Sequence, residues 1–166
     1  MAVLKSDISL FMIGAFQSAE EVVNKLSQCA MTKGFVDETF AVNVMRRERE
    51  YPTGLQMGVP IAIPHIHEGC LESFFAMALP DDPVSFFNMG DSSEELFVEI
   101  VFLFGITDPS EQAAVLKKFA RTFQRAEVLE ELRDSTSTEE LARKIKNVLG
   151  DMVSIGKSAD RREIIE

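Results

Sequence analysis

The stretch that decides the fold lies at residues 59–67 and reads VPIAIPHIH. It is an apolar run that ends in both histidines of the chain, His65 and His67. Proline cannot donate a hydrogen bond to a neighbouring strand, so Pro60 and Pro64 predict a short strand that stops at Pro64. We therefore expect His65 to stand at the end of a strand, held by the core and open to a partner.

Three further apolar, β-prone runs flank this stretch in the sequence. They cover residues 8–15, 74–79 and 97–106. Each predicts a strand, and the length and strength of the third run indicate a central strand. Residues 51–58, just before the histidine stretch, are expected to form a loop.

Helix signals alternate with these strands. Ser18 and Glu21 form a capping box, and Asp108 followed by Pro109 is a firm start signal for a later helix. The predicted helices cover residues 18–34, 37–50, 108–123 and 136–150. A sheet flanked by helices is the α/β class, which is the fold class that we predict.

Composition supports a single globular domain. The chain has 166 residues, 46% of them hydrophobic and 27% charged, which is enough to bury a sizeable core. We assign the domain to residues 1–150. The charged residues 151–166 are read as a tail that either extends the last helix or frays.

The charge balance and the cysteines limit the cellular location and the partners that we expect for this protein. The formal net charge is -10, so nucleic acid and anionic membranes are poor partners. Cys29 and Cys70 stand in neither a CxxC nor a metal-ligand spacing, and neither a signal peptide nor an apolar run of membrane length is evident. We expect a protein of the cytoplasm that meets other proteins.

The histidine pair alone leaves three interpretations open. A histidine near a core is most often packed and hydrogen-bonded without further function. A neutral imidazole is also a nucleophile, and the hydrogen bond made by one ring nitrogen decides which nitrogen keeps the lone pair. Finally, His65 and His67 would face the same way in an extended segment and could ligate a metal, although no cysteine or carboxylate pair nearby has a matching spacing.

A family resemblance favours the nucleophile. Residues 47–55, REREYPTGL, followed by residues 60–65, PIAIPH, resemble the active-site signature of the A component of enzyme II in the bacterial sugar phosphotransferase system. Within these A components, the signature resembles that of type 2, the fructose/mannitol/galactitol class. Further similarity to its galactitol branch covers residues 83–90, 98–104 and 108–112. The resemblance extends over about residues 5–150.

The resemblance implies a function for His65. Members of this family take a phosphoryl group from a histidine of the small phosphocarrier protein and pass it to a cysteine of the B component. His65 is the implied acceptor, no cofactor or metal is implied, and relatives have a mixed sheet covered by helices on both faces. Phosphoryl transfer demands positioning and charge stabilisation more than covalent work by the protein, which suits this assignment.

The resemblance also implies an arginine and hydrogen-bond donors beside His65. Counted back from Thr53, Arg47 matches the family's arginine. Counted back from His65, Arg49 matches, because this chain is longer between the two motifs. We favour Arg47 and keep Arg49 as the alternative, with a hydroxyl from Thr53 and a closely approaching backbone amide from Gly54.

The chain departs from the family pattern at several places. Where many relatives carry a second histidine, near the start of the helix after the long strand, the candidates are Ser110 and Gln112, which could donate to a phosphoryl oxygen. Ile66 occupies a position that is usually small, and we expect it to be an exposed apolar contact for the donor protein. His67 has no counterpart in the family motif, so it is either a surface histidine or a helper of His65.

Two other functions remain open from the sequence. One is a regulatory module like the nitrogen-related relatives, which signal through the phosphorylation state of the same histidine. The other, with less support, is a His-x-His metal-binding protein. The sugar or polyol is not readable from this sequence, because the A component does not contact it.

Overall fold

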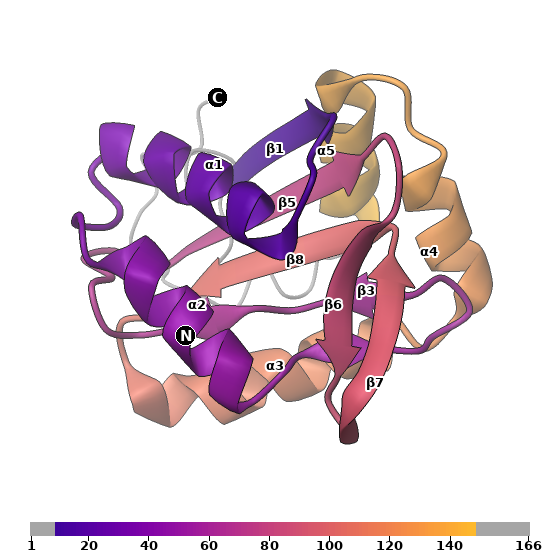
Figure 1. The fold of residues 1–166 in the computed structure, drawn as a ribbon. Coiled ribbons are helices and arrows are strands. Elements are labelled where there is room, and N and C mark those ends of the chain that lie inside the picture. The colour runs from indigo at the N-terminus through magenta and orange to yellow at the C-terminus, as the bar shows by residue number, and fades with distance from the viewer. Residues whose placement is uncertain (1–8, 149–166) are drawn as a thin grey trace.

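The computed structural model describes residues 9–148, and the predicted tail at residues 151–166 lies outside them. In this part of the chain an eight-stranded sheet is packed against five helices (Figure 1). The strands are β1 (Ser9–Gly14), β2 (Gly54–Leu55), β3 (Ile61–Ala62), β4 (His65–Ile66), β5 (Phe74–Pro80), β6 (Val84–Asn88), β7 (Asp91–Val98) and β8 (Ile100–Gly105). The helices are α1 (Ala19–Thr32), α2 (Phe40–Glu50), α3 (Pro109–Thr122), α4 (Ala126–Arg133) and α5 (Thr138–Val148).

The sheet is mixed, as predicted, and β8 lies inside it. The strand order is β1-β5-β8-β3-β2-β6-β7, and β4 also pairs with β8. β8 runs antiparallel to β5 but parallel to β3 and β4. Every residue of β8 is buried, as expected for a central strand with neighbours on both sides.

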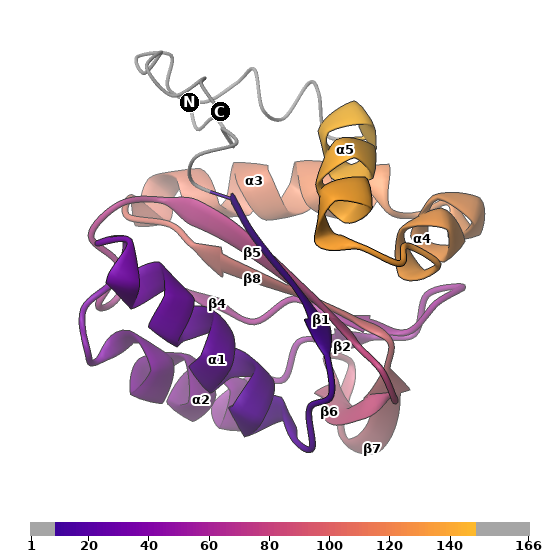
Figure 2. The ribbon, with the colours of Figure 1, turned by 90° about the horizontal axis from the view of Figure 1, so that it is seen from above.

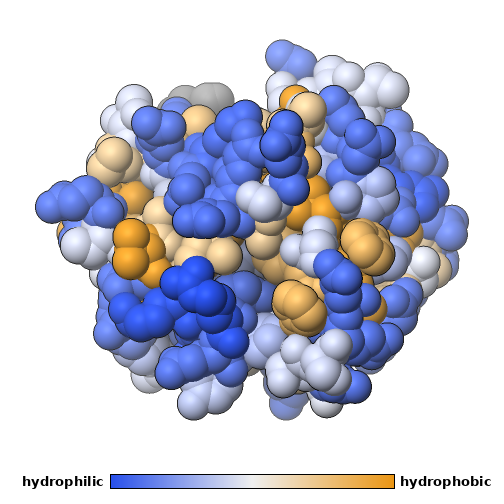
Figure 3. All heavy atoms as spheres, in the orientation of Figure 1, coloured by the Kyte–Doolittle hydropathy of each residue, from blue (hydrophilic) through white to orange (hydrophobic). Residues whose placement is uncertain are grey.

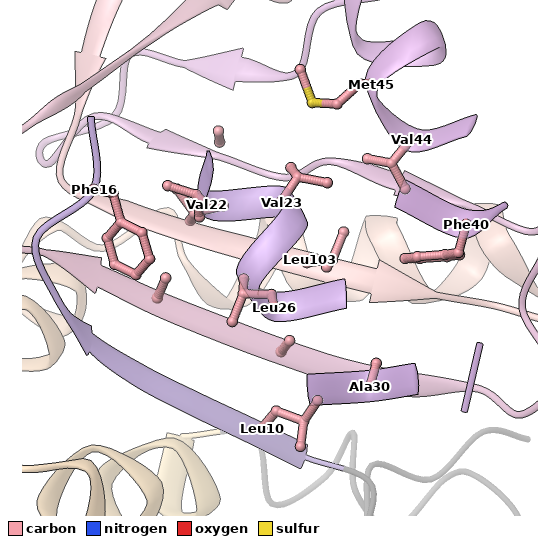
Figure 4. Packing of buried hydrophobic residues seen from close by; sticks show 14 of the residues in the cluster. Leu10, Phe16, Val22, Val23, Leu26, Ala30, Phe40, Val44, Met45 and Leu103 are labelled. Atoms are coloured by element: carbon pink, nitrogen blue, oxygen red, sulfur yellow. The ribbon is translucent and has the colours of Figure 1, made fainter. Parts of the chain in front are cut away.

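Helices cover both faces of the sheet, which confirms the predicted α/β architecture. Figure 2 shows α1 and α2 on one face and α3, α4 and α5 on the other. Successive residues of a strand point to opposite faces, so Leu103 of β8 packs with the α1 and α2 side whereas Phe102 packs with the α3 side. Figure 4 shows the first of these layers, with Leu26 and Val44 among its members.

The predicted helix starts are confirmed where the sequence carries a cap. The Ser18 hydroxyl oxygen accepts from the Glu21 amide at 3.1 Å and opens α1. The Asp108 carboxylate accepts from the Ser110 amide at 3.0 Å, and Pro109 is the first residue of α3. These local signals act because the first amides of a helix have no partner inside it.

Several elements differ from the prediction. Residues 84–98 form the β6–β7 hairpin, which the sequence analysis missed, and Phe97 belongs to β7, so that β8 begins only at Ile100. α4 was also missed, because its N-cap residue Arg125 makes no side-chain cap hydrogen bond. The predicted loop 51–58 contains the two-residue strand β2. Across residues 9–148, none of the helices combines the length and the apolar character needed to cross a membrane.

Candidate active site

His65 opens the short strand β4 beside the central strand. Pro64 separates β3 from β4 and lacks an amide hydrogen, yet its carbonyl accepts from the Phe104 amide at 3.1 Å and keeps the chain against β8. His65 is paired with Phe104 and is only 6% exposed. The expectation of a strand end is wrong in this detail, since His65 begins a second short strand and is more buried than a rim residue.

A backbone carbonyl fixes the tautomer of His65. The Nδ1 atom lies 2.8 Å from the carbonyl oxygen of Ile63. A carbonyl oxygen can only accept a hydrogen bond, so Nδ1 carries the hydrogen. In the neutral ring, Nε2 then carries the free lone pair. Nε2 has no hydrogen-bond partner among residues 9–148. The buried polar atoms without a partner do not include it.

Burial keeps this imidazole neutral. It lowers the pKa of His65 below its ordinary value of 6.5; the Ile63 carbonyl opposes the shift and the charge of Arg47 adds to it. A neutral ring with a free Nε2 lone pair is the nucleophilic form of histidine. The site can therefore present a nitrogen nucleophile at neutral pH.

Arg47 is the arginine whose charge contributes to the pKa shift of His65. It lies near the end of α2, is half-buried, and its charge acts on the His65 ring. Within the described residues its buried Nε atom has no hydrogen-bond partner, and its guanidinium carbon lies 5.3 Å from the ring centre of Tyr51. Arg49 is exposed on the same helix, and its charge is not among the causes of the His65 shift. The charge of Arg47 thus adds to the lowering of the His65 pKa, whereas that of Arg49 does not.

Thr53 is turned inward toward a buried carboxyl group. Its hydroxyl donates to Oε1 of Glu48 at 2.9 Å, and its amide donates to Oε2 of Glu48 at 2.8 Å. The amide of Ile63 in turn donates to the Thr53 hydroxyl oxygen at 3.1 Å. The hydroxyl hydrogen of Thr53 is thus already used, so in this arrangement Thr53 does not offer it to a phosphoryl group as we expected.

Glu48 is the residue of the site that the sequence analysis missed. A carboxylate in a charged helix is normally taken as solvent-exposed, but Glu48 is only 8% exposed. A usable signal was present in the spacing: Phe40, Val44 and Glu48 are four residues apart and lie on one face of α2, and all three are buried.

Gly54 makes a close approach, but to a strand. A Cβ atom at this position would lie 2.5 Å from the carbonyl oxygen of Phe87. Its own carbonyl accepts from the Met89 amide at 2.8 Å. Only glycine allows β2 to come this close to β6, which fixes the loop that carries Thr53.

The start of α3 lies at the same end of the sheet as His65, because β8 leads from Phe104 into this helix. Of the two candidates there, Ser110 is engaged: its hydroxyl donates to the cap residue Asp108 at 2.8 Å. Gln112 is partly exposed, and its side chain makes no hydrogen bond within residues 9–148. Gln112 is the side chain of this pair that remains available.

Of the two residues after His65, Ile66 differs from expectation, whereas His67 agrees with the first of its two expected roles, a surface histidine. Ile66 is 5% exposed and belongs to the core against α1 and α2, so the expectation of an exposed contact for a donor protein is wrong. His67 is exposed, because β4 ends at Ile66 and the alternation of a strand no longer applies. The two histidines therefore do not share an environment. Among the described residues, no three His, Cys, Asp or Glu side chains are grouped closely enough to hold a metal ion.

The comparisons with known proteins bear on this arrangement. Residues 5–148 match the family model described as phosphoenolpyruvate-dependent sugar phosphotransferase system, EIIA 2. The chain belongs to this family. The family resemblance read from the sequence is thereby confirmed, and EIIA components are phosphotransferases.

Individual members of the family are similar to this chain in sequence, and solved structures are similar to it in fold. The galactitol-specific EIIA component of Escherichia coli K12 is 25% identical over 119 residues, which cover 71% of this chain and 79% of the relative. The mannitol IIA enzyme of Escherichia coli, solved in complex with phosphorylated mannitol IIB, has a TM-score of 0.68 at 18% identity, covering 91% of this EIIA chain and 99% of the other. The nitrogen regulatory protein IIA-Ntr of Neisseria meningitidis has a TM-score of 0.66 at 21% identity, covering 84% and 97%. At such identities the solved structures show a shared fold.

Proposed function

We propose that this EIIA domain, assigned to residues 1–150, is a cytoplasmic phosphotransfer protein of a sugar or polyol uptake system. It accepts a phosphoryl group on His65 from the histidine phosphocarrier protein and passes it to a cysteine of a B component. The observation that carries the proposal is the free Nε2 of a neutral His65 whose Nδ1 hydrogen is held by Ile63.

The transfer needs two displacements at phosphorus. In the first, the Nε2 lone pair of His65 attacks the phosphorus of the donor's phosphohistidine, a new phosphorus–nitrogen bond forms and the donor's bond breaks. In the second, a thiolate sulfur of the B component attacks the same phosphorus and the bond to His65 breaks. Throughout, the hydrogen stays on Nδ1 and is donated to the Ile63 carbonyl oxygen, and this hydrogen bond stabilises the positive charge that the ring gains.

Arg47 and Gln112 are the donors that we assign to the phosphoryl oxygens. Arg47 has a buried Nε with no partner among residues 9–148 and a charge that lowers the pKa of His65, which favours it over the exposed Arg49. Gln112 stands near the start of α3 with a free amide, where the first amides of the helix also attract an anion. Ser110 and His67 take no direct part in this proposal.

A regulatory role is the second candidate, and the likeness to the nitrogen regulatory protein favours it. Such a protein would use the phosphorylation state of His65 to control another protein. Genes for B and C components beside this gene would support the transport role, and their absence there would support the regulatory one.

The test of the acceptor is direct phosphorylation. The chain is incubated with phosphoenolpyruvate, enzyme I and the phosphocarrier protein, and the modified residue is located by mass spectrometry. We expect one acid-labile, base-stable phosphate on His65 and none in a His65→Ala variant whose circular dichroism matches that of the parent. Phosphate on His67, or none at all with competent partners, would contradict the proposal.

A further inference from the structure

A buried carboxyl group supports the backbone that holds His65. Glu48 lies in the last turn of α2, where the helix dipole disfavours a negative charge. It is 8% exposed, and within the described residues it forms no ion pair. Burying a carboxylate costs free energy unless donors satisfy its oxygens. We therefore asked what the buried Glu48 carboxyl group does for the site.

The hydrogen bonds of Glu48 lead to His65 in three steps. Both carboxylate oxygens accept from Thr53, one from its hydroxyl and one from its amide. The Thr53 hydroxyl oxygen and carbonyl accept from the Ile63 amide at 3.1 and 3.3 Å. The Ile63 carbonyl accepts from Nδ1 of His65 at 2.8 Å. Ile63 is therefore held at its amide by the Glu48–Thr53 pair while its carbonyl holds the imidazole.

We propose that Glu48 is a positioning residue for His65, which acts through Thr53 and the backbone of Ile63 to keep the imidazole in its Nδ1-protonated form with Nε2 presented for phosphoryl transfer. This inference rests on the proposed function of His65. It assigns to the carboxylate the task of accepting both Thr53 donors, which sets the direction of the Thr53 hydroxyl and leaves its oxygen free to accept from Ile63.

The charge state of Glu48 belongs to the same arrangement. Burial raises the pKa of Glu48 to about 7, although the two Thr53 hydrogen bonds and the charge of Arg47 lower it. Arg47, on the same helix, is the charged group that acts on this carboxyl, and the segment between α2 and β2 contributes the Thr53 donors. Protonation removes one acceptor site from the carboxyl, so the hold on Thr53 weakens as the group becomes neutral.

The test compares Glu48→Gln with Glu50→Gln, an exposed residue at the end of the same helix. Nitrogen-15 NMR of labelled, unphosphorylated full chain at pH 8 reads the His65 tautomer directly. We expect the parent and Glu50→Gln to show Nδ1–H alone and Glu48→Gln to gain a measurable Nε2–H fraction. Phosphoryl acceptance from the phosphocarrier should slow by about tenfold or more in Glu48→Gln, since small misplacements of a reacting group are costly.

A second pair of variants separates positioning from folding. Thr53→Val removes the hydroxyl at nearly constant volume and should reproduce the tautomer change, whereas Thr53→Ser retains the hydroxyl and should restore the parent spectrum. An unchanged tautomer in folded Glu48→Gln and Thr53→Val overturns the inference, even if His65 is phosphorylated normally. Failure of the parent to accept phosphate would instead contradict the proposed function, and the tautomer spectra would still decide the role of Glu48.

Discussion

The segment around His65 and the outer face of the β6–β7 hairpin distribute their side chains in opposite ways. Glu48, Thr53 and His65 are polar and buried. On the hairpin, Phe87 and Phe97 are apolar and are 44% and 57% exposed. Figure 3 shows apolar side chains among hydrophilic ones in the region of this hairpin.

The difference shows where this fold depends on exact partners. Buried polar groups are tolerated only when each has a donor or acceptor in place, so the His65 segment depends on a few specific hydrogen bonds. Exposed phenylalanines such as these do not depend on a specific partner in this way. Isolated apolar side chains are common on protein surfaces. We therefore expect substitutions to have large effects in the first region and small effects in the second.

The largest effect is expected at Ile66, beside the active histidine. Ile66→Gly should lower the free energy of unfolding by about 2–5 kcal/mol, because it leaves a cavity in the core against α1 and α2. The control, Ile66→Val, removes one methyl group and should cost about 0.5–1.5 kcal/mol. Urea denaturation measures both. A change below that of the control would mean that Ile66 does not pack as the structure has it.

A pH-dependent effect is expected from Glu48. Its folded-state pKa is raised from 4.5 to about 7, so its contribution to stability is fully present below pH 4.5 and is lost as the pH rises through 7. The loss is on the order of 3 kcal/mol. His65 acts in the opposite sense, because its pKa is lowered and its contribution is lost as the pH falls.

Glu48→Gln isolates the first of these contributions. The difference in unfolding free energy between the variant and the parent is measured by urea denaturation from pH 5 to pH 8. We expect this difference to shift in favour of the variant as the pH rises. A difference that is constant over this range would show that Glu48 does not titrate there.

A small effect is expected on the hairpin. Phe97→Thr keeps a β-prone residue at an exposed place on β7 and should change the unfolding free energy by about 0.5 kcal/mol or less. Its neighbour Leu96 is buried, and Leu96→Ala should cost about 2–5 kcal/mol. Similar losses in the two variants would remove the contrast between the hairpin's faces.

The smallest effect is expected at His67. It is exposed and lies beyond the end of β4, so His67→Gln should accept phosphate at a rate close to that of the parent. Rapid-quench measurement of phosphoryl transfer from the phosphocarrier checks this. A loss approaching that of His65→Ala would reassign the roles of the two histidines.

Local signals predicted those parts of the fold that local chemistry determines. Ser18 and Asp108 cap α1 and α3 through side-chain hydrogen bonds that the sequence already indicates. β6 and β7 were missed because Phe87 and Phe97 place apolar side chains on the solvent face and hide the alternation of a half-buried strand. Their pairing depends on a turn and on contacts with the rest of the sheet.

In the candidate site, too, some features were predicted from a local motif and others were not. The motif indicated His65 and Arg47, and the charge of Arg47 is one of the causes that lower the pKa of His65. The inward position of Ile66 and the partners of Glu48 depend on how α2 packs across β4, although the four-residue spacing of Glu48 from Val44 did indicate a buried position. Long-range packing therefore decided the environment of Ile66 and the partners of Glu48.

The position of β7 at the end of the strand order has a consequence for behaviour at high concentration. The outer edge of this strand is unpaired within residues 9–148, and such an edge can template intermolecular β-sheet growth. Asp91, Glu94 and Glu95 line this strand and are exposed. Two copies that met edge to edge would bring these carboxylates together, and their repulsion opposes aggregation through the strand that also exposes Phe97.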